Sequence, residues 1–201
     1  MFLSRQLGIA FFRNPRTGSR AIRQLILPYC DIREVRHTRV TEETPFYKHI
    51  PPREARPHVE RFGIDWNAIR KFTVVRNPFT RLVSYYHWRL LQVPPPREFK
   101  THLLREVRSN NIMCGSIEYY AGDGTGKLAV DEVIRHEALE ENLADLFARW
   151  NVPIDVEKLK IVGASPTYDL KEYYDDQSID FVHRNYDFEF SQLGYSRELP
   201  V

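Results

Sequence analysis

The sequence is poor in several features that mark particular classes of protein. It has two cysteines in 201 residues, and Cys30 and Cys114 follow no metal-binding or redox spacing. Their scarcity excludes a disulfide scaffold and favours reduced thiols, so we expect a cytoplasmic protein. No apolar run approaches the roughly 20 residues of a membrane-spanning helix, and no small-residue cleavage site of a signal peptide follows the N-terminal residues. There is no repeat and no low-complexity tract.

Charge is nearly balanced overall, at a formal net +2, but it is unevenly distributed along the chain. Residues 1–110 carry 21 Lys and Arg against 9 Asp and Glu, a net +12, whereas residues 111–201 carry 8 against 18, a net −10. Of the 29 basic residues, 22 are Arg, whose planar guanidinium matches phosphate and sulfate oxygens. The asymmetry favours either an anion-binding surface or the packing of a basic half against an acidic half.

Hydrophobic residues make up 42% of the chain, and the length suits one α/β domain over residues 1–201 with a sizeable core. Short apolar segments alternate with helical patterns, which predicts a mainly parallel β-sheet with helices on both faces. In such a sheet, ligands bind beyond the carboxyl ends of the strands. The predicted strands are 9–12, 32–36, 72–76, 132–135 and 159–162, and the predicted helices are 19–27, 80–91, 137–150 and 176–186.

The turn after the first of these strands has the composition of an anion-binding loop. Residues 13–20 read Arg-Asn-Pro-Arg-Thr-Gly-Ser-Arg and lead into a predicted helix. A helix N-terminus offers free N–H groups and a partial positive charge, and Thr17 and Ser19 add hydroxyl donors. Arg16 and Arg20 add full charges. The loop is not a Walker A motif, which is longer and ends in Lys followed by Ser or Thr, and by itself it also fits an ordinary N-cap.

A second candidate anion site follows the third predicted strand. Residues 72–86 read Phe-Thr-Val-Val-Arg-Asn-Pro-Phe-Thr-Arg-Leu-Val-Ser-Tyr-Tyr, so the strand ends at Arg76 and Pro78 breaks it. An Arg at a strand end and Ser84 from the next helix can converge on one anion. The alternative is that Arg76 is buried against a carboxylate and Ser84 faces solvent. We interpret Arg81 as a salt-bridge partner rather than a ligand.

These two motifs resemble those of sulfotransferases that use 3′-phosphoadenosine 5′-phosphosulfate (PAPS), of the bacterial and carbohydrate type. Residues 15–19 are similar to the family's 5′-phosphosulfate loop, usually Pro-Lys-Thr-Gly followed by Ser or Thr, with Arg16 in the place of Lys. Arg76 and Ser84 match the family's 3′-phosphate ligands in their Arg-Asn-Pro form. The resemblance covers roughly residues 9–195. It implies a P-loop-kinase-like α/β fold and PAPS as donor, with no metal.

A third segment resembles the family's base-carrying sequence. Residues 48–54 read Lys-His-Ile-Pro-Pro-Arg-Glu, similar to Lys-His-x-x-x-Arg-Glu, in which the His is taken as the general base. The resemblance therefore implies this role for His49, and a neutral imidazole can accept the proton of an acceptor hydroxyl. Residues 130–143 resemble the family's fourth strand and the helix that follows. Six other histidines compete with His49: His37, His58, His87, His102, His136 and His183.

The function implied by the resemblance is transfer of the PAPS sulfuryl group to a hydroxyl or amine of a small molecule or glycan, with no nucleic-acid partner. A P-loop-type small-molecule or nucleotide kinase is an alternative, weakened by the missing Walker A Lys and the lack of a clear magnesium ligand. A non-catalytic nucleotide-binding protein is another, suggested by the departures at Arg16 and Arg20. The acceptor and the oligomeric state stay open. The implied catalytic residues are His49 and Arg16, and the implied donor-binding residues are Arg16, Thr17, Gly18, Ser19, Arg20, Arg76 and Ser84.

Overall fold

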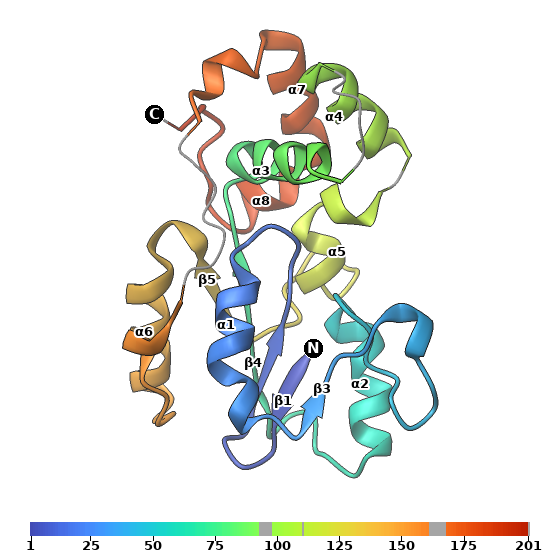
Figure 1. Cartoon of the computed structure of the whole chain (residues 1–201), viewed down its shortest axis with the longest axis vertical. Helices are drawn as coiled ribbons and strands as arrows, with labels where there is room; N and C mark the ends of the chain where they lie inside the picture. The colour runs from blue at the N-terminus through green and yellow to red at the C-terminus, as the bar shows by residue number, and fades with distance from the viewer. Residues whose placement is uncertain (93–97, 110, 161–167, 201) are drawn as a thin grey trace. The chain divides into compact units, whose positions relative to one another are not determined.

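The computed structural model describes residues 1–92, 98–109, 111–160 and 168–200. The chain divides into two compact units. Unit 1 consists of residues 1–75 and 118–164 and contains the whole β-sheet, and unit 2 consists of residues 76–117 and 165–201 and is helical (Figure 1). One domain over residues 1–201 stays a prediction.

The sheet of unit 1 has five strands in the order β3-β1-β2-β4-β5. Its β2-β4-β5 part is parallel, and β1 is antiparallel to both of its neighbours. The predicted α/β class is confirmed, and the sheet is mixed because β1 adds an antiparallel strand that the sequence pattern did not indicate. The strands are β1 (Phe2–Ser4), β2 (Ile9–Phe12), β3 (Ile32–Arg33), β4 (Arg70–Val75) and β5 (Glu132–Arg135).

Two predicted strands, 9–12 and 132–135, have the predicted bounds. The predicted strand 72–76 begins earlier, at Arg70, and ends at Val75. The predicted strand 32–36 is shorter, because β3 pairs with β1 over only two residues. Of the predicted strand 159–162, the first two residues lie in no strand and the other two lie outside the described residues.

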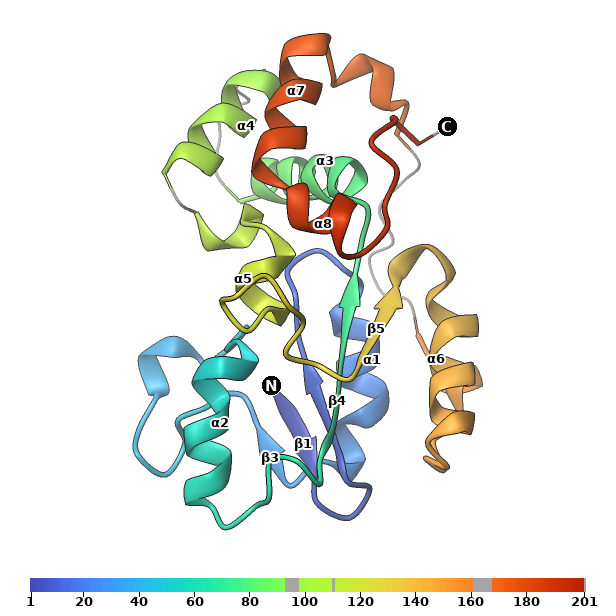
Figure 2. The ribbon, with the colours of Figure 1, turned by 180° about the vertical axis from the view of Figure 1, so that it is seen from behind.

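Helices of unit 1 flank the sheet, and unit 2 is built from helices (Figures 1 and 2). No helix in the described part of the chain is long and apolar enough to cross a membrane. In unit 1 the helices are α1 (Ser19–Ile26), η1 (Leu27–Tyr29), η2 (His37–Arg39), α2 (Pro52–Arg61), η4 (His136–Ala138), α6 (Leu139–Arg149) and η5 (Val156–Lys158). In unit 2 they are α3 (Pro78–Leu90), α4 (Phe99–Arg108), η3 (Ile112–Cys114), η6 (Leu170–Glu172), α7 (Asp176–Asn185) and α8 (Asp187–Ser191), while α5 (Ile117–Ala121) begins at the last residue of a unit 2 segment.

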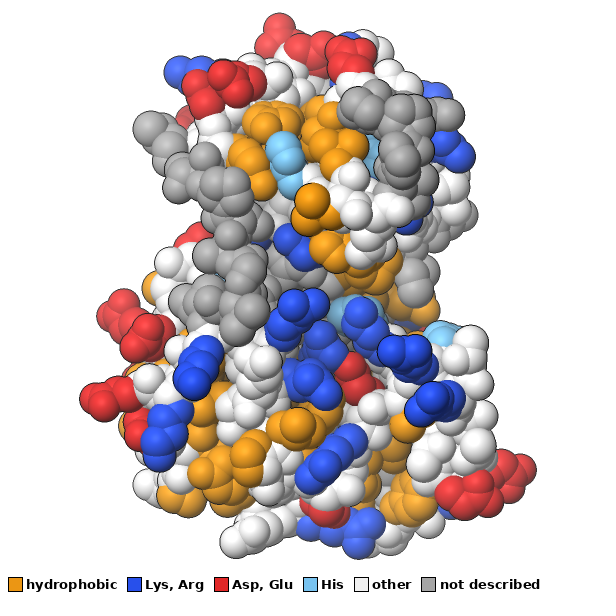
Figure 3. All heavy atoms as spheres, in the orientation of Figure 1, with side chains coloured by type: hydrophobic (Ala, Val, Ile, Leu, Met, Phe, Trp, Pro, Cys, Tyr) orange, Lys and Arg blue, Asp and Glu red, His pale blue; other side chains and the backbone are white. Residues whose placement is uncertain are grey.

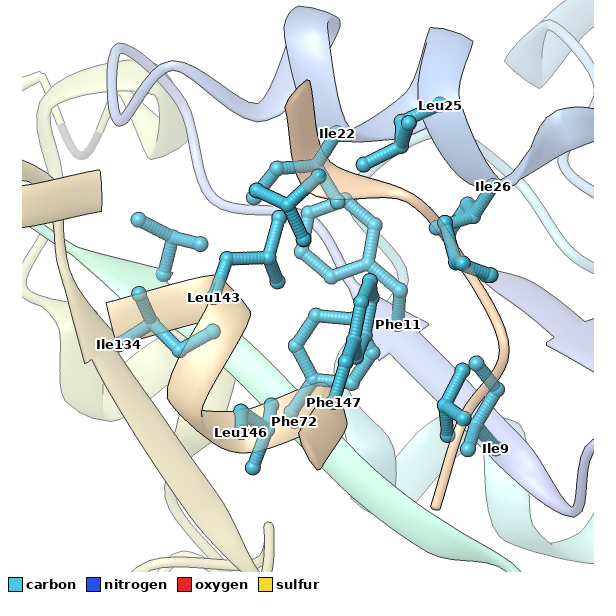
Figure 4. Packing of buried hydrophobic residues seen from close by; sticks show 14 of the residues in the cluster. Ile9, Phe11, Ile22, Leu25, Ile26, Phe72, Ile134, Leu143, Leu146 and Phe147 are labelled. Atoms are coloured by element: carbon cyan, nitrogen blue, oxygen red, sulfur yellow. The ribbon is translucent and has the colours of Figure 1, made fainter. Parts of the chain in front are cut away.

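The main core of unit 1 lies on one face of the sheet, under α1 and α6 (Figure 4). Alternate strand residues supply it, because successive side chains of a strand point to opposite faces. The rings of Phe11 on β2 and Phe72 on β4 stack with their centroids 4.9 Å apart. This packing holds α1 on the paired strands β2 and β4. The labelled core residues are Ile9, Phe11, Ile22, Leu25, Ile26, Phe72, Ile134, Leu143, Leu146 and Phe147.

Unit 2 is built around α3, which the other helices cover with aromatic side chains. Phe79 packs edge-on against Tyr174, with ring centroids 5.2 Å apart. Arg81 is fully buried, and its Nη2 lies 3.3 Å from the Glu189 Oε1 in α8. The interpretation of Arg81 as a salt-bridge partner is therefore confirmed.

Candidate functional site

The loop between β2 and α1 ends in a glycine that cannot be replaced without strain. Gly18 is the N-cap of α1 and has φ 75°, in the left-handed region that favours glycine. A Cβ added here would lie 2.9 Å from the His136 Nδ1 and 3.3 Å from the Leu139 Cδ2. The loop can therefore pack against the start of η4 and α6 only because this residue has no side chain.

Asn14, which we did not single out in the sequence, fixes the loop on the sheet. It is fully buried, and its Nδ2 donates to the Thr73 Oγ1 at 2.9 Å and to the Val74 carbonyl at 2.7 Å, both on β4. Its own carbonyl accepts from the Thr17 Oγ1 at 3.0 Å and the Ser19 Oγ at 3.2 Å. The two predicted hydroxyl donors thus close the loop on itself. The Ala21 N–H donates to the Gly18 carbonyl at 3.0 Å, whereas the N–H groups of the first two residues of α1 have no acceptor within the helix and are donors suited to an anion.

Positive charge gathers around this loop. Figure 3 shows Lys and Arg side chains grouped on one face of unit 1. Burial lowers the pKa of Lys48, and the neighbouring charges of Arg13 and Arg20 lower it further. Arg16 is half-buried within the loop, while Arg20 is exposed on the first turn of α1. Such a cluster creates a local positive potential that attracts anions.

His49 lies against the first residue of the same loop. It is 6% exposed, and its Nδ1 is 3.0 Å from the Arg13 carbonyl. A carbonyl can only accept, so Nδ1 carries the proton and Nε2 keeps its lone pair. Burial lowers the pKa of His49 to about 3, although the bond to Arg13 opposes this shift. The imidazole is therefore neutral at neutral pH, with one defined nitrogen available as a proton acceptor.

The surroundings of His49 come from α2 and α5. Tyr120 packs edge-on against the imidazole, with ring centroids 6.1 Å apart. Arg53, in the first turn of α2, donates to the Tyr119 carbonyl at 2.9 Å and lies over the Tyr119 ring at 4.8 Å. The Arg of the Lys-His-x-x-x-Arg-Glu segment therefore holds the aromatic residues that pack beside the histidine.

The Arg-Asn-Pro motif forms the start of α3 in unit 2. Asn77 is the N-cap, its Oδ1 accepts from the Phe79 N–H at 2.9 Å, and Pro78 occupies the first turn, where no N–H is needed. Arg76 directly precedes this cap, and its Nε donates to the Thr80 Oγ1 at 3.0 Å. Ser84 is fully buried on α3, so the alternative in which it faces solvent is wrong.

The structure thus brings His49 to the loop of residues 13–20 within unit 1, and it places Arg76 and Ser84 on the first segment of unit 2. Their roles as ligands stay predictions. The sequence patterns did not single out Asn14, Arg13 or their distant partners Thr73 and Glu34, because polar residues after a strand give no sign of long-range bonds. In the part of the chain that is described, no three His, Cys, Asp or Glu side chains gather as a metal site would require.

Comparison with known proteins agrees with these features. A family model described as "Sulfotransferase family" matches residues 2–116, more than half of the chain. The match spans β1 to β4, the loop that opens α1, His49 and the segment from Arg76 to Ser84. Searches of curated proteins and of solved structures gave no match. The chain therefore belongs to the sulfotransferase family, whose members transfer sulfuryl groups and have a P-loop-kinase-like α/β fold.

Proposed function

We propose that this protein is an enzyme that transfers the sulfuryl group of PAPS to a hydroxyl or amine of a small molecule or glycan, with His49 as the general base. One observation carries the proposal. A buried, neutral histidine with its Nε2 unprotonated lies on the first residue of a basic loop that opens a helix. Membership of the sulfotransferase family supplies the type of reaction.

The two anion motifs have complementary roles in this proposal. The 5′-phosphosulfate binds at the loop of residues 16–20, through the N-terminal N–H groups of α1 and the charges of Arg16 and Arg20. Arg76 and Ser84 bind the 3′-phosphate. Supporting this division, β2 and β4 are parallel neighbours in the sheet, and the loop and Arg76 directly follow these two strands in the sequence.

The proposed reaction is an in-line displacement at sulfur. The acceptor oxygen forms a bond to sulfur, and the bond from sulfur to the 5′-phosphate oxygen breaks. Its electron pair stays on that oxygen, giving the 3′,5′-bisphosphate. The acceptor proton passes to His49 Nε2. Although burial keeps the pKa of His49 low, the acceptor oxygen becomes much more acidic as its bond to sulfur forms, so a weak base in the right place is sufficient.

Arg16 acts on the leaving group in this proposal. The oxygen that leaves sulfur gains negative charge, and a nearby cation stabilises it. Arginine replaces the compact ammonium of lysine with a broader fork that stays protonated. The same replacement favours a second candidate, a non-catalytic protein that binds the nucleotide without transferring its sulfuryl group.

Nucleotide titration by calorimetry tests the donor class. We expect adenosine 3′,5′-bisphosphate to bind the wild type, and ATP to bind far more weakly because it lacks the 3′-phosphate. Arg76→Ala should weaken the bisphosphate about ten- to a hundredfold, since a charge-assisted contact is worth about 1.5–3 kcal/mol. Arg89→Ala removes a cation from the last turn of α3, the helix that Arg76 precedes, and serves as the control. Equal affinities for Arg76→Ala and Arg89→Ala, or a preference for ATP, would contradict the proposal.

A further inference from the structure

The side chain of Arg13 forms a buried link that donor binding does not explain. Its Nη1 forms a hydrogen-bonded ion pair with the Glu34 Oε1, and the two side chains are only 10% and 8% exposed. Its Nε lies 3.4 Å from the Ser19 Oγ at the start of α1. The guanidinium therefore joins the residue after β3 to the N-terminus of α1, while the Arg13 carbonyl holds His49.

Glu34 belongs to a segment that is itself bonded to the residues before His49. The next residue, Val35, donates its N–H to the Phe46 carbonyl at 2.8 Å and accepts from the Lys48 N–H at 3.2 Å. The other carboxylate oxygen of Glu34 lies 3.3 Å from the Met1 amino group. Two connections thus run from this segment toward the histidine, one through the Val35 backbone and one through the Arg13 side chain.

The charge of Arg13 is neutralised by a carboxylate of the protein itself, that of Glu34. Burial lowers the pKa of Arg13 and its ion pair with Glu34 opposes this shift, while the nearby charges of Arg23 and Arg20 lower it further. A buried guanidinium is expensive unless it is paired and hydrogen-bonded. Glu34 therefore fixes where Arg13 lies, and it does so without adding a negative charge that repels a donor phosphate, because the pair is neutral.

We propose that Arg13 and Glu34 are positioning residues for His49. The Glu34 carboxylate fixes the Arg13 side chain, and the residue so held presents its carbonyl to His49 Nδ1. That carbonyl keeps the proton on Nδ1, although neutral imidazole in free histidine carries it mainly on Nε2. Loss of the pair releases the carbonyl and lets the ring return to the common tautomer, in which Nε2 cannot accept a proton. The consequence for turnover rests on the proposed function, whereas the tautomer itself does not.

The tautomer can be measured directly by ¹⁵N NMR of histidine-labelled protein, with His49→Asn to assign the signals. The wild type should show His49 protonated on Nδ1. Glu34→Gln should shift the population toward Nε2–H and lower turnover at least about tenfold, by analogy with the loss when a catalytic histidine has the wrong tautomer. Affinity for adenosine 3′,5′-bisphosphate should change less than about threefold, because no donor ligand is altered. Asp31→Asn is the control. Asp31 directly precedes β3, and its ion pair with Arg5 is exposed.

The outcomes separate positioning from simple stabilisation. A wild-type His49 ring protonated on Nε2 would overturn the proposal. A Glu34→Gln variant with a lower melting temperature but an unchanged Nδ1–H tautomer would also overturn it. If Glu34→Gln fails to fold, Glu34→Asp keeps the charge and shortens the reach, and the same shift toward Nε2–H is expected in smaller degree. A tautomer that responds to Glu34 in a protein with no wild-type turnover supports positioning and contradicts the proposed function.

Discussion

At the scale of single residues, backbone strain coincides with the two residues to which we give catalytic roles. Arg16 and His49 have φ of 60° and 65°, and among the described non-glycine residues only Asn151 shares a positive φ. Asparagine adopts this conformation readily, but for other residues it costs on the order of 1–3 kcal/mol. Such strain persists where surrounding contacts impose it, and here those contacts include the hydrogen bond that His49 donates to the Arg13 carbonyl.

The low pKa of His49 predicts a pH-dependent stability. Its pKa falls from 6.5 in the unfolded chain to about 3 in the fold, so the unfolded state binds more protons between these values. The free energy of unfolding should therefore decrease as pH falls from 6.5 toward 3, by up to about 1.4 kcal/mol per pH unit. Well above pH 6.5 the His49 ring is neutral in both states and adds no pH dependence.

Denaturant unfolding at several pH values measures this effect. His49→Asn is the matched variant, because asparagine accepts the positive φ and does not titrate. The wild type should lose more stability than His49→Asn on acidification from neutral pH. Parallel pH curves for the two proteins would mean that His49 is not buried as a neutral ring.

The conformation of Gly18 leads to a second prediction, about stability and nucleotide binding. Gly18→Ala adds a Cβ 2.9 Å from the His136 Nδ1 at a φ of 75°. Gly63→Ala is the control, since Gly63 has φ 71° with nothing within 4 Å of an added Cβ. Both variants should lose about 1 kcal/mol through the positive φ, and Gly18→Ala should lose more and bind adenosine 3′,5′-bisphosphate more weakly. Chemical denaturation and calorimetry compare the two variants. Equal losses of stability and of affinity would contradict the proposal that the loop binds the donor.

At the scale of elements, the sequence predicted those helices and strands that are determined by their own residues. The short segments Ile-Ala-Phe-Phe and Glu-Val-Ile-Arg were enough to predict β2 and β5 with their bounds. The three-residue β1 was too short to show a period, and α2 was hidden by Pro52 and Pro57. Pro52 lies in the first turn of α2, where proline is tolerated, so its presence did not exclude a helix.

The residues of the candidate site likewise fall into those that the sequence predicted and those that it did not. Residues 16–20 and His49 could be singled out because short motifs carry them. The partner of Arg13 could not, because Glu34 lies 21 residues away and its pairing depends on how the segment after β3 folds back. Asn14 likewise forms its bonds with β4, about 60 residues later in the chain, and local sequence gives no sign of such a contact.

The buried ion pair between Arg81 on α3 and Glu189 on α8 leads to a prediction about the stability of unit 2. Glu189 is fully buried, accepts from the Ile117 N–H at 2.8 Å and pairs with Arg81. Glu189→Ala leaves the Arg81 charge buried and should lower the free energy of unfolding by about 3–5 kcal/mol. Glu60→Ala, which removes the exposed partner of Arg56, should cost less than about 1 kcal/mol. Urea unfolding compares the two variants, and a similar loss in each would contradict the structural role of Arg81.

At the scale of the whole molecule, the uneven charge and the family match agree. The match over residues 2–116 covers nearly all of the basic half of the sequence, which contains the loop of residues 13–20, His49, Arg76 and Ser84. These motifs do not indicate the acceptor, because the roles that we propose for them concern the donor and the transferred group. The sequence was therefore enough to predict the family, while the donor stays a prediction and the acceptor stays open.

The central claim is that the protein transfers the sulfuryl group of PAPS, and an assay with radiolabelled PAPS over a broad panel of acceptors tests it most directly. We predict transfer to at least one acceptor by the wild type, with most turnover lost in Arg16→Ala and a measurable part kept in Arg16→Lys, because either cation stabilises the leaving oxygen. His49→Asn should lower turnover about 10²–10⁴-fold with nearly unchanged donor affinity. Tight binding of adenosine 3′,5′-bisphosphate, together with no transfer to any acceptor and no slow hydrolysis of PAPS, would contradict the account and identify a nucleotide-binding protein without catalysis.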